Sequence, residues 1–132
     1  MKEFDLKTGM VGEARARVTE DNTAVKFGSG KVNVFGTPAM IALMEEASIK
    51  AVDNMLPEQY ATVGIDLKVR HMAATPIGMN VTASAKLVNI DGRKLTFKVE
   101  AFDEKEKIGE GDHFRYIIEL DKFIARAESK GR

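Results

Sequence analysis

The chain contains no cysteine, and only two histidines and three prolines occur in its 132 residues. The lack of cysteine excludes disulfide bonds, thiol catalysis and thiolate zinc sites. We therefore expect any nucleophile in this chain to be an oxygen, from a side chain or from a water molecule. Because His71 and His113 are the only remaining strong metal ligands, we expect neither a metal nor another cofactor.

An excess of charge of either sign is also absent, since 20 Lys and Arg residues balance 20 Asp and Glu residues. Nucleic-acid affinity comes mainly from phosphate neutralisation by Lys and Arg, so we expect no nucleic-acid partner. No apolar run approaches the roughly 18 residues that a membrane span needs, and the N-terminus has no signal-peptide pattern. The sequence predicts a soluble cytoplasmic protein with no membrane partner.

The length of 132 residues predicts one domain, residues 1–132, with a single active or binding site. Period-two alternation marks a short strand at residues 13–19 and a second at 23–27, which we expect to form a hairpin. A charged tail at residues 121–132 predicts one or two helical turns.

Four longer alternating runs follow the helix described below, and they predict an antiparallel sheet. A change of phase at Val88 in the second run indicates a β-bulge, and Asp91 and Gly92 indicate a hairpin turn after it. Strands segregated from one helix are typical of an α+β fold. We therefore expect one long central helix wrapped by an antiparallel sheet of five to six strands.

The central helix is predicted to begin at Thr37 and Pro38, with Thr37 as N-cap, and to run to about Met55. Glu45 falls at the centre of its apolar arc, whereas Glu46 falls on the polar face. A buried carboxylate costs several kcal/mol unless partners satisfy it, so Glu45 requires a partner.

The two histidines receive different predictions from the strand patterns. Alternation through Leu67 and Val69 continues to His71 and predicts an inward-facing imidazole. His113 alternates with Phe114 and Tyr116, which predicts a surface or interface position. Considered singly, Thr37 is typical of a helix N-cap, and His71 is typical of a core or rim histidine whose hydrogen bonds are satisfied. Periodicity alone therefore leaves a purely structural role open for each residue.

Two segments carry a resemblance to a known family. Residues 34–45 (VFGTPAMIALME) and 70–78 (RHMAATPIG), together with 109–115 and 120–123, resemble the fluoroacetyl-CoA thioesterases over residues 32–126. The resemblance implies the hotdog fold and a homodimer or a tetramer, with acyl-CoA sites at the interface where two sheets join.

The resemblance also implies roles for five residues. The family's catalytic threonine, glutamate and histidine fall on Thr37, Glu45 and His71, and its substrate-contacting glycine and arginine fall on Gly64 and Arg115. His71 would act as general acid and base. Thr37 would attack the thioester or position substrate, and Glu45 would orient His71, attack the thioester itself or activate water. A covalent and a water-attack route therefore both remain open.

The chain departs from the family between Phe27 and Phe35, where a short Gly/Ser/Lys-rich link replaces a phenylalanine-bearing lid. We therefore predict a thioesterase for short or medium acyl-CoA substrates, with Phe35 as a pocket wall. The alternatives are a non-catalytic binding module for acyl-CoA or another small ligand, and a hotdog hydratase. No Asp-x4-His-like hydratase signature is seen near the helix start.

Overall fold

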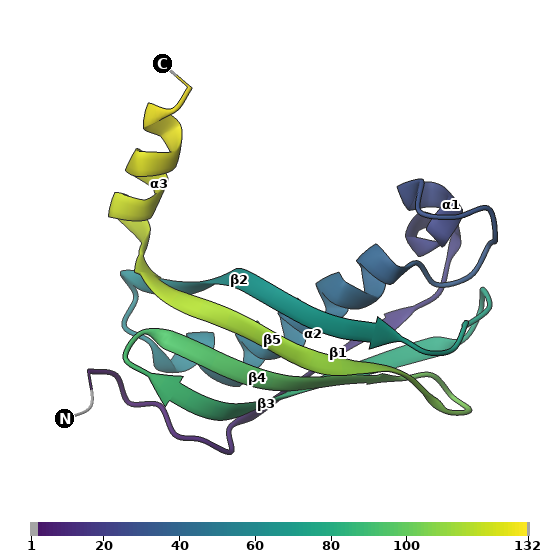
Figure 1. Ribbon diagram of the computed structural model, residues 1–132, viewed down its shortest axis with the longest axis horizontal. Coiled ribbons are helices and arrows are strands. Elements are labelled where there is room, and N and C mark those ends of the chain that lie inside the picture. The colour runs from purple at the N-terminus through teal and green to yellow at the C-terminus, as the bar shows by residue number, and fades with distance from the viewer. Residues whose placement is uncertain (1–2, 132) are drawn as a thin grey trace.

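The computed structural model describes residues 3–131, in which a curled antiparallel sheet wraps one long helix (Figure 1). The helices are α1 (Ala24–Phe27), α2 (Thr37–Val52) and α3 (Leu120–Ser129), with 3₁₀ turns η1 (Glu20–Asn22) and η2 (Asp53–Met55). The strands are β1 (Val11–Arg17), β2 (Tyr60–His71), β3 (Asn80–Asp91), β4 (Lys94–Phe102) and β5 (Lys107–Glu119). The predicted α+β architecture is confirmed, with five strands.

The strands lie in the order β1-β3-β4-β5-β2, and every neighbouring pair is antiparallel. The predicted bulge in β3 is confirmed by a register shift between Leu87 and Asn89. Gly92 turns the following hairpin with a φ of 62°, a left-handed conformation that glycine adopts without strain. Since β1 and β2 are the two edge strands, the long strand β2 has one edge unpaired within residues 3–131.

The hydrophobic core lies between α2 and the concave face of the sheet. The helix contributes one apolar stripe and the strands contribute alternate residues, as their period of two requires. Members with no exposed surface include Met40, Met44, Ala47, Val52, Val81, Ala83, Leu87, Leu95 and Phe97. This packing fixes α2 relative to the sheet, whose strands β2 and β5 also carry site residues. No helix within residues 3–131 is long and apolar enough to cross a membrane.

The predicted strand at residues 23–27 is wrong, because these residues form the single helical turn α1. The Thr23 side chain accepts a hydrogen bond from the Lys26 backbone N–H, and Gly28 closes the turn in the left-handed conformation. These caps satisfy the backbone groups at both ends of the single turn. The strand β1, which was expected to pair with residues 23–27, pairs with β3 instead. The predicted hairpin is therefore also wrong.

The predicted surface position of His113 is wrong as well. His113 and Arg115 lie opposite Phe97 and Leu95 in the β4–β5 ladder, and residues paired in this way share one face of the sheet. Because Phe97 and Leu95 face the core, both polar side chains turn toward α2 and are buried. The more apolar alternate set, which includes Tyr116, faces outward.

In β2, a register shift between Gly64 and Asp66 marks a bulge at the exposed Ile65. Before the bulge, Gly64 is on the inward face, and after it Leu67 is, because the extra residue shifts the alternation by one position. The alternation from Leu67 onward then places His71 on the inward face, as predicted.

Both helix predictions need adjustment at their ends. The N-cap of α2 is Gly36, so Thr37 is the first helical residue and its hydroxyl is available for another partner. Helical geometry reaches Met55 only through η2, because α2 itself ends at Val52. The tail forms α3, ten residues that extend away from the sheet, and so exceeds the one or two turns expected (Figure 1).

Gly12 sets how closely β1 approaches α2, which gives a test of the packing. A Cβ atom there would collide with the backbone carbonyl of Ala47 and lie 2.5 Å from the Ala51 backbone nitrogen. We expect Gly12→Ala to lower the free energy of unfolding by about 1–3 kcal/mol, measured by chemical denaturation. Gly30→Ala, where the nearest atom is 3.4 Å away, is the control and should change it by less than about 0.5 kcal/mol. Equal stabilities would contradict the predicted close contact.

Candidate active site

The first group of site residues is a hydrogen-bonded pair of Thr37 and His71. Thr37 stands in the first turn of α2 and His71 at the last position of β2, and Thr37 Oγ1 lies 2.8 Å from His71 Nδ1. A hydroxyl and an imidazole at this distance form the nucleophile–base arrangement of acyl-transfer enzymes. The structure thus brings together two of the three residues predicted to be catalytic.

The environment of His71 favours a neutral ring. Burial lowers the pKa of His71 below its ordinary value of 6.5, and an interaction with the Ala73 backbone offsets part of this effect. His71 Nε2 is buried and has no hydrogen-bond partner within residues 3–131. A buried polar atom of this kind costs free energy unless something outside the described contacts satisfies it.

A cavity of about 280 Å³ opens beside this pair. It is lined by Ala24, Ser29, Val34, Phe35, Thr37, His71, Met72, Ala73 and Ala74. Phe35 is buried and its backbone N–H donates to the Thr75 carbonyl oxygen at 2.8 Å, which fixes this part of the wall. The wall is mostly apolar, and α1 and the loop after it contribute Ala24 and Ser29. Thr37 and His71 supply polar groups beside this surface.

The second group is centred on Glu45, two helical turns further along α2. Its predicted position at the centre of the buried arc is wrong, because its side chain is 39% exposed and the buried stripe of α2 runs through Met44 and Ala47. Glu45 Oε2 accepts a hydrogen bond from Arg115 Nη1 at 3.3 Å. The predicted need for a partner is therefore met by a cation on β5. No hydrogen bond or ion pair within residues 3–131 joins Glu45 to Thr37 or His71. The eight-residue separation amounts to about 12 Å along the helix axis.

Arg115 is only 3% exposed, and each of its guanidinium nitrogens has a protein partner. Nε donates to Thr62 Oγ1 at 2.8 Å and Nη2 to the Thr62 carbonyl oxygen at 2.9 Å. Thr62 in turn donates from its hydroxyl and backbone N–H to the Asp53 carboxylate, at 2.6 and 3.1 Å. Burial lowers the pKa of Arg115, while the charges of Asp53 and Glu45 raise it. This network holds the cation in place beneath Glu45.

His113 belongs to the same cluster, although the sequence interpretation placed it elsewhere. Its Nε2 lies 3.1 Å from Arg115 Nη1 and its Nδ1 lies 2.9 Å from the Asp66 carbonyl oxygen. The spacing of His113, Arg115 and Ile117 at every second position was the available signal. It was outweighed by the more apolar alternate residues of the same strand.

Gly64 lies opposite Arg115 in the β2–β5 ladder and leaves the space that the Glu45 cluster occupies. A Cβ atom at Gly64 would lie 2.7 Å from Glu45 Oε2 and 3.2 Å from His113 Cε1. Gly64 and Arg115, the two residues predicted to contact substrate, thus belong with Glu45. Within one chain they do not join the Thr37–His71 pair, and substrate contact by either stays a prediction.

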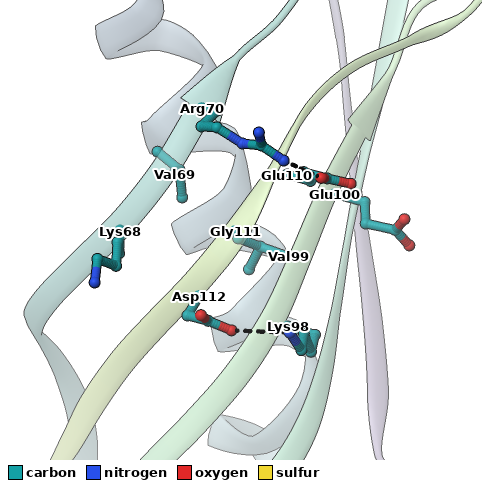
Figure 2. Close-up of a pocket in the computed structure, with 9 residues that line it drawn as sticks. All are labelled: Lys68, Val69, Arg70, Lys98, Val99, Glu100, Glu110, Gly111 and Asp112. Carbon is teal, nitrogen blue, oxygen red and sulfur yellow. Dashed lines mark hydrogen bonds and ion pairs between the residues drawn. The ribbon is translucent and has the colours of Figure 1, made fainter.

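A larger depression of about 700 Å³ lies on the outer face of the sheet, away from α2 (Figure 2). Its charged walls come from Lys68, Arg70, Lys98, Glu100, Glu110 and Asp112. Arg70 pairs with Glu110 at 2.6 Å and Lys98 pairs with Asp112 at 3.4 Å. None of the predicted site residues lines it, and its charges largely neutralise one another. The Thr37–His71 cavity is therefore the better candidate for chemistry.

Comparison with known proteins agrees with this geometry. A family model of the fluoroacetyl-CoA-specific thioesterases matches residues 18–121. The fluoroacetyl-CoA thioesterase of Streptantibioticus cattleyicolor is 40% identical over 97 residues, which cover 74% of this chain and 70% of that protein.

Two solved structures extend the comparison to three dimensions. A threonine-to-serine variant of a fluoroacetyl-CoA thioesterase in complex with acetyl-CoA has a TM-score of 0.89 at 31% identity, covering 96% of this chain and 100% of that one. A hot-dog-like protein from Thermanaerovibrio acidaminovorans, 21% identical, has a TM-score of 0.86 over 95% of this chain and 93% of that one, and supports the fold alone. The chain has the hotdog fold and belongs to the fluoroacetyl-CoA-specific thioesterase family of thioester hydrolases.

Proposed function

We propose that this protein hydrolyses short or medium acyl-CoA thioesters to the free acid and CoA, with Thr37, His71 and Glu45 as its catalytic residues. The observation that carries the proposal is the 2.8 Å hydrogen bond between Thr37 Oγ1 and His71 Nδ1 beside a largely apolar cavity. The family match supports thioester chemistry at this site. Apolar lining suits an acyl chain, and the hydroxyl–imidazole pair suits attack on its carbonyl carbon.

In the proposed reaction, neutral His71 accepts the Thr37 proton through Nδ1 as Thr37 Oγ1 attacks the thioester carbonyl. The protonated ring then gives that proton to the departing CoA sulfur, and water hydrolyses the acyl-threonine by the same sequence of proton transfers. Backbone N–H groups in the first turn of a helix lack intrahelical partners, so the start of α2 offers donors for the developing oxyanion.

The substrate range follows from the size and composition of the cavity. About 280 Å³ bounded by Phe35, Ala73 and Ala74 accommodates a short or medium acyl chain. A related thioesterase has been solved with acetyl-CoA, which is consistent with a small acyl group. The helical segment that lines this cavity ahead of α2 is α1, which is only one turn long because it ends at Phe27.

A second copy of the chain supplies Glu45 to each site in this proposal. The edge strand β2 is 12 residues long and leaves Ile65 51% exposed, and unpaired edges of this length are commonly covered in native proteins. Antiparallel pairing of two β2 strands, with His71 of one copy opposite Gly64 of the other, would bring Glu45 of the second copy toward His71. The unpartnered His71 Nε2 supports this arrangement, since its N–H would then meet a carboxylate.

The role of the Thr37 hydroxyl is tested by comparing Thr37→Ala with Thr37→Ser. We expect Thr37→Ala to lower kcat by about 100-fold or more, since it removes the nucleophile that His71 activates. Thr37→Ser keeps a hydroxyl and should retain most of the activity. The measurement is release of free CoA from acyl-CoAs of increasing chain length, with melting temperatures as the folding control. A Thr37→Ala protein at full rate would point to water attack, and no release by the wild type would point to a binding module.

The protonation state of His71 predicts how the rate depends on pH. Because burial lowers the pKa of His71 below 6.5, the neutral ring, which is able to accept the Thr37 proton, predominates above that value. We therefore expect kcat to decline as pH falls, with the midpoint of the decline below 6.5. A decline centred at or above 6.5 would contradict the expectation that burial governs the pKa of His71, because a carboxylate beside Nε2 acts in the opposite direction. A rate that does not change with pH across this range would exclude His71 as the base. The profile is measured under saturating acyl-CoA, so that it reports the bound complex.

If each active site combines residues of two copies of the chain, two variants that each have low activity should complement each other in a mixed dimer. Co-expressed Thr37→Ala and Glu45→Gln chains would form mixed dimers in which one site combines an intact Thr37–His71 pair with an intact Glu45. We expect CoA release from the purified mixed dimer at up to half the wild-type rate, although each parent variant has only a low residual rate. If all three residues acted from one chain, the mixed dimer would show only that residual rate. Light scattering determines whether the wild type is a dimer or a tetramer.

A further inference from the structure

His113 is a buried histidine that has no direct part in the proposed reaction. It is 1% exposed, and both of its ring nitrogens have protein partners, the Asp66 carbonyl oxygen at Nδ1 and Arg115 Nη1 at Nε2. Neither nitrogen is therefore left to meet a thioester or a water molecule. Any contribution of His113 to hydrolysis acts through a neighbouring side chain.

The partners of His113 determine its tautomer. A carbonyl oxygen only accepts hydrogen bonds and a guanidinium only donates them. Nδ1 therefore carries the hydrogen and donates to Asp66, while the lone pair of Nε2 accepts from Arg115. Burial and the Arg115 charge both lower the pKa of His113, while the Asp66 carbonyl and the Glu45 charge act in the opposite direction. This hydrogen-bond pattern requires a neutral ring, and the net lowering of the pKa of His113 favours one.

Arg115 Nη1 is the atom that joins His113 to Glu45. This nitrogen carries two hydrogens, and its two partners are His113 Nε2 at 3.1 Å and Glu45 Oε2 at 3.3 Å. Thr62 holds the opposite edge of the guanidinium through Nε and Nη2. A guanidinium is planar and rigid, so contacts on both edges fix the direction in which Nη1 donates.

We propose that His113 is a positioning residue, which accepts one hydrogen of Arg115 Nη1 and thereby directs the other onto the Glu45 carboxylate. The inference rests on the proposed function, in which Glu45 completes the Thr37–His71 site. The packing around Gly64 supports it, because a Cβ atom there would meet both His113 Cε1 and Glu45 Oε2. The imidazole and the carboxylate thus share one space that only a glycine leaves open.

Two matched substitutions separate the two hydrogen bonds of His113. In His113→Asn the amide nitrogen takes the place of Nδ1–H and keeps the bond to Asp66, but no acceptor reaches Arg115. In His113→Gln the longer side chain brings an acceptor oxygen to the position of Nε2. We expect kcat of His113→Asn to fall at least about tenfold with little change in KM, the scale of one hydrogen bond to a charged group. His113→Gln should stay within about threefold of the wild type, with both melting temperatures alike.

The dependence on Glu45 is tested by adding His113→Asn to Glu45→Gln. If His113 acts through the carboxylate, the second substitution lowers kcat no further once the carboxylate is gone. A further tenfold loss in the Glu45→Gln protein, or equal kcat values for His113→Asn and His113→Gln, would overturn the positioning role while leaving thioesterase activity intact.

A spectroscopic measurement tests the same inference without turnover. Nitrogen NMR of the unaltered protein should show His113 with hydrogen on Nδ1 only, and slow rotation that keeps separate signals for the two Arg115 Nη groups. His113→Gln should preserve the separate signals and His113→Asn should merge them. Merged signals in the wild type would overturn the inference. A wild type that hydrolyses no acyl-CoA would instead refute the proposed function, and the spectra would still decide the role of His113.

Discussion

The packing of α2 against the concave face of the sheet is the constraint on which both groups of site residues depend. The helix buries its Met40, Met44 and Ala47 stripe against the strands, which fixes its rotation about its own axis. With that rotation fixed, Thr37 meets the end of β2 and Glu45 meets β5. The rise of the helix then sets the distance between Thr37 and Glu45, and this distance is too long for side-chain rearrangement alone to bring the two residues together. A site that uses both residues therefore needs either two copies of the chain or a substrate that spans them.

The buried charge of Arg115 is the second organising feature, and the surrounding polar groups follow from it. An ionised guanidinium in a protein interior is tolerated only when its donors are satisfied and its charge is balanced. Asp53 at the end of α2 meets this demand through Thr62, and Glu45 meets it directly. The same contacts tie the end of the helix to the start of β2. Charge balance, helix termination and orientation of Glu45 are thus results of one hydrogen-bonded network.

The two polar groups also differ in how completely they are satisfied. Around Arg115, every guanidinium nitrogen and both nitrogens of His113 have partners, which makes that cluster rigid. His71 instead has one satisfied nitrogen and one buried nitrogen with no partner within residues 3–131. The Glu45 cluster offers a carboxylate, and the Thr37–His71 pair has an imidazole nitrogen that needs a hydrogen-bond partner, so each group has what the other lacks. The exposed edge of β2 lies on the same strand as His71 and Gly64, so joining two sheets there would unite the two groups without altering either.

Much of this architecture could be predicted from the sequence because local patterns are strong where they coincide with burial. The phase change near Val88 predicted the β3 bulge and the 3.6-residue period predicted α2, and Glu45 stood out as a carboxylate among apolar neighbours. The motifs around Thr37 and His71 were specific enough to indicate the family. Residues 23–27 were predicted incorrectly because alternation over five residues is compatible with one helical turn, and capping by Thr23 and Gly28 decided between them.

The sequence by itself determined the fold class and the family, and it predicted which side chains carry chemistry, since these depend on residue type and spacing along one chain. Only the tertiary structure decided which of those side chains meet. His113 shows the physical reason. An alternating strand has two faces, and the apolar residues of β5 predicted that His113 faces outward. Its actual face is set by register with β4, where Phe97 and Leu95 are buried, and by a hydrogen-bonded network that offsets the cost of burying His113 and Arg115. Partners from distant strands supply that compensation, so the local spacing of His113 and Arg115 could not by itself outweigh the more apolar alternate residues.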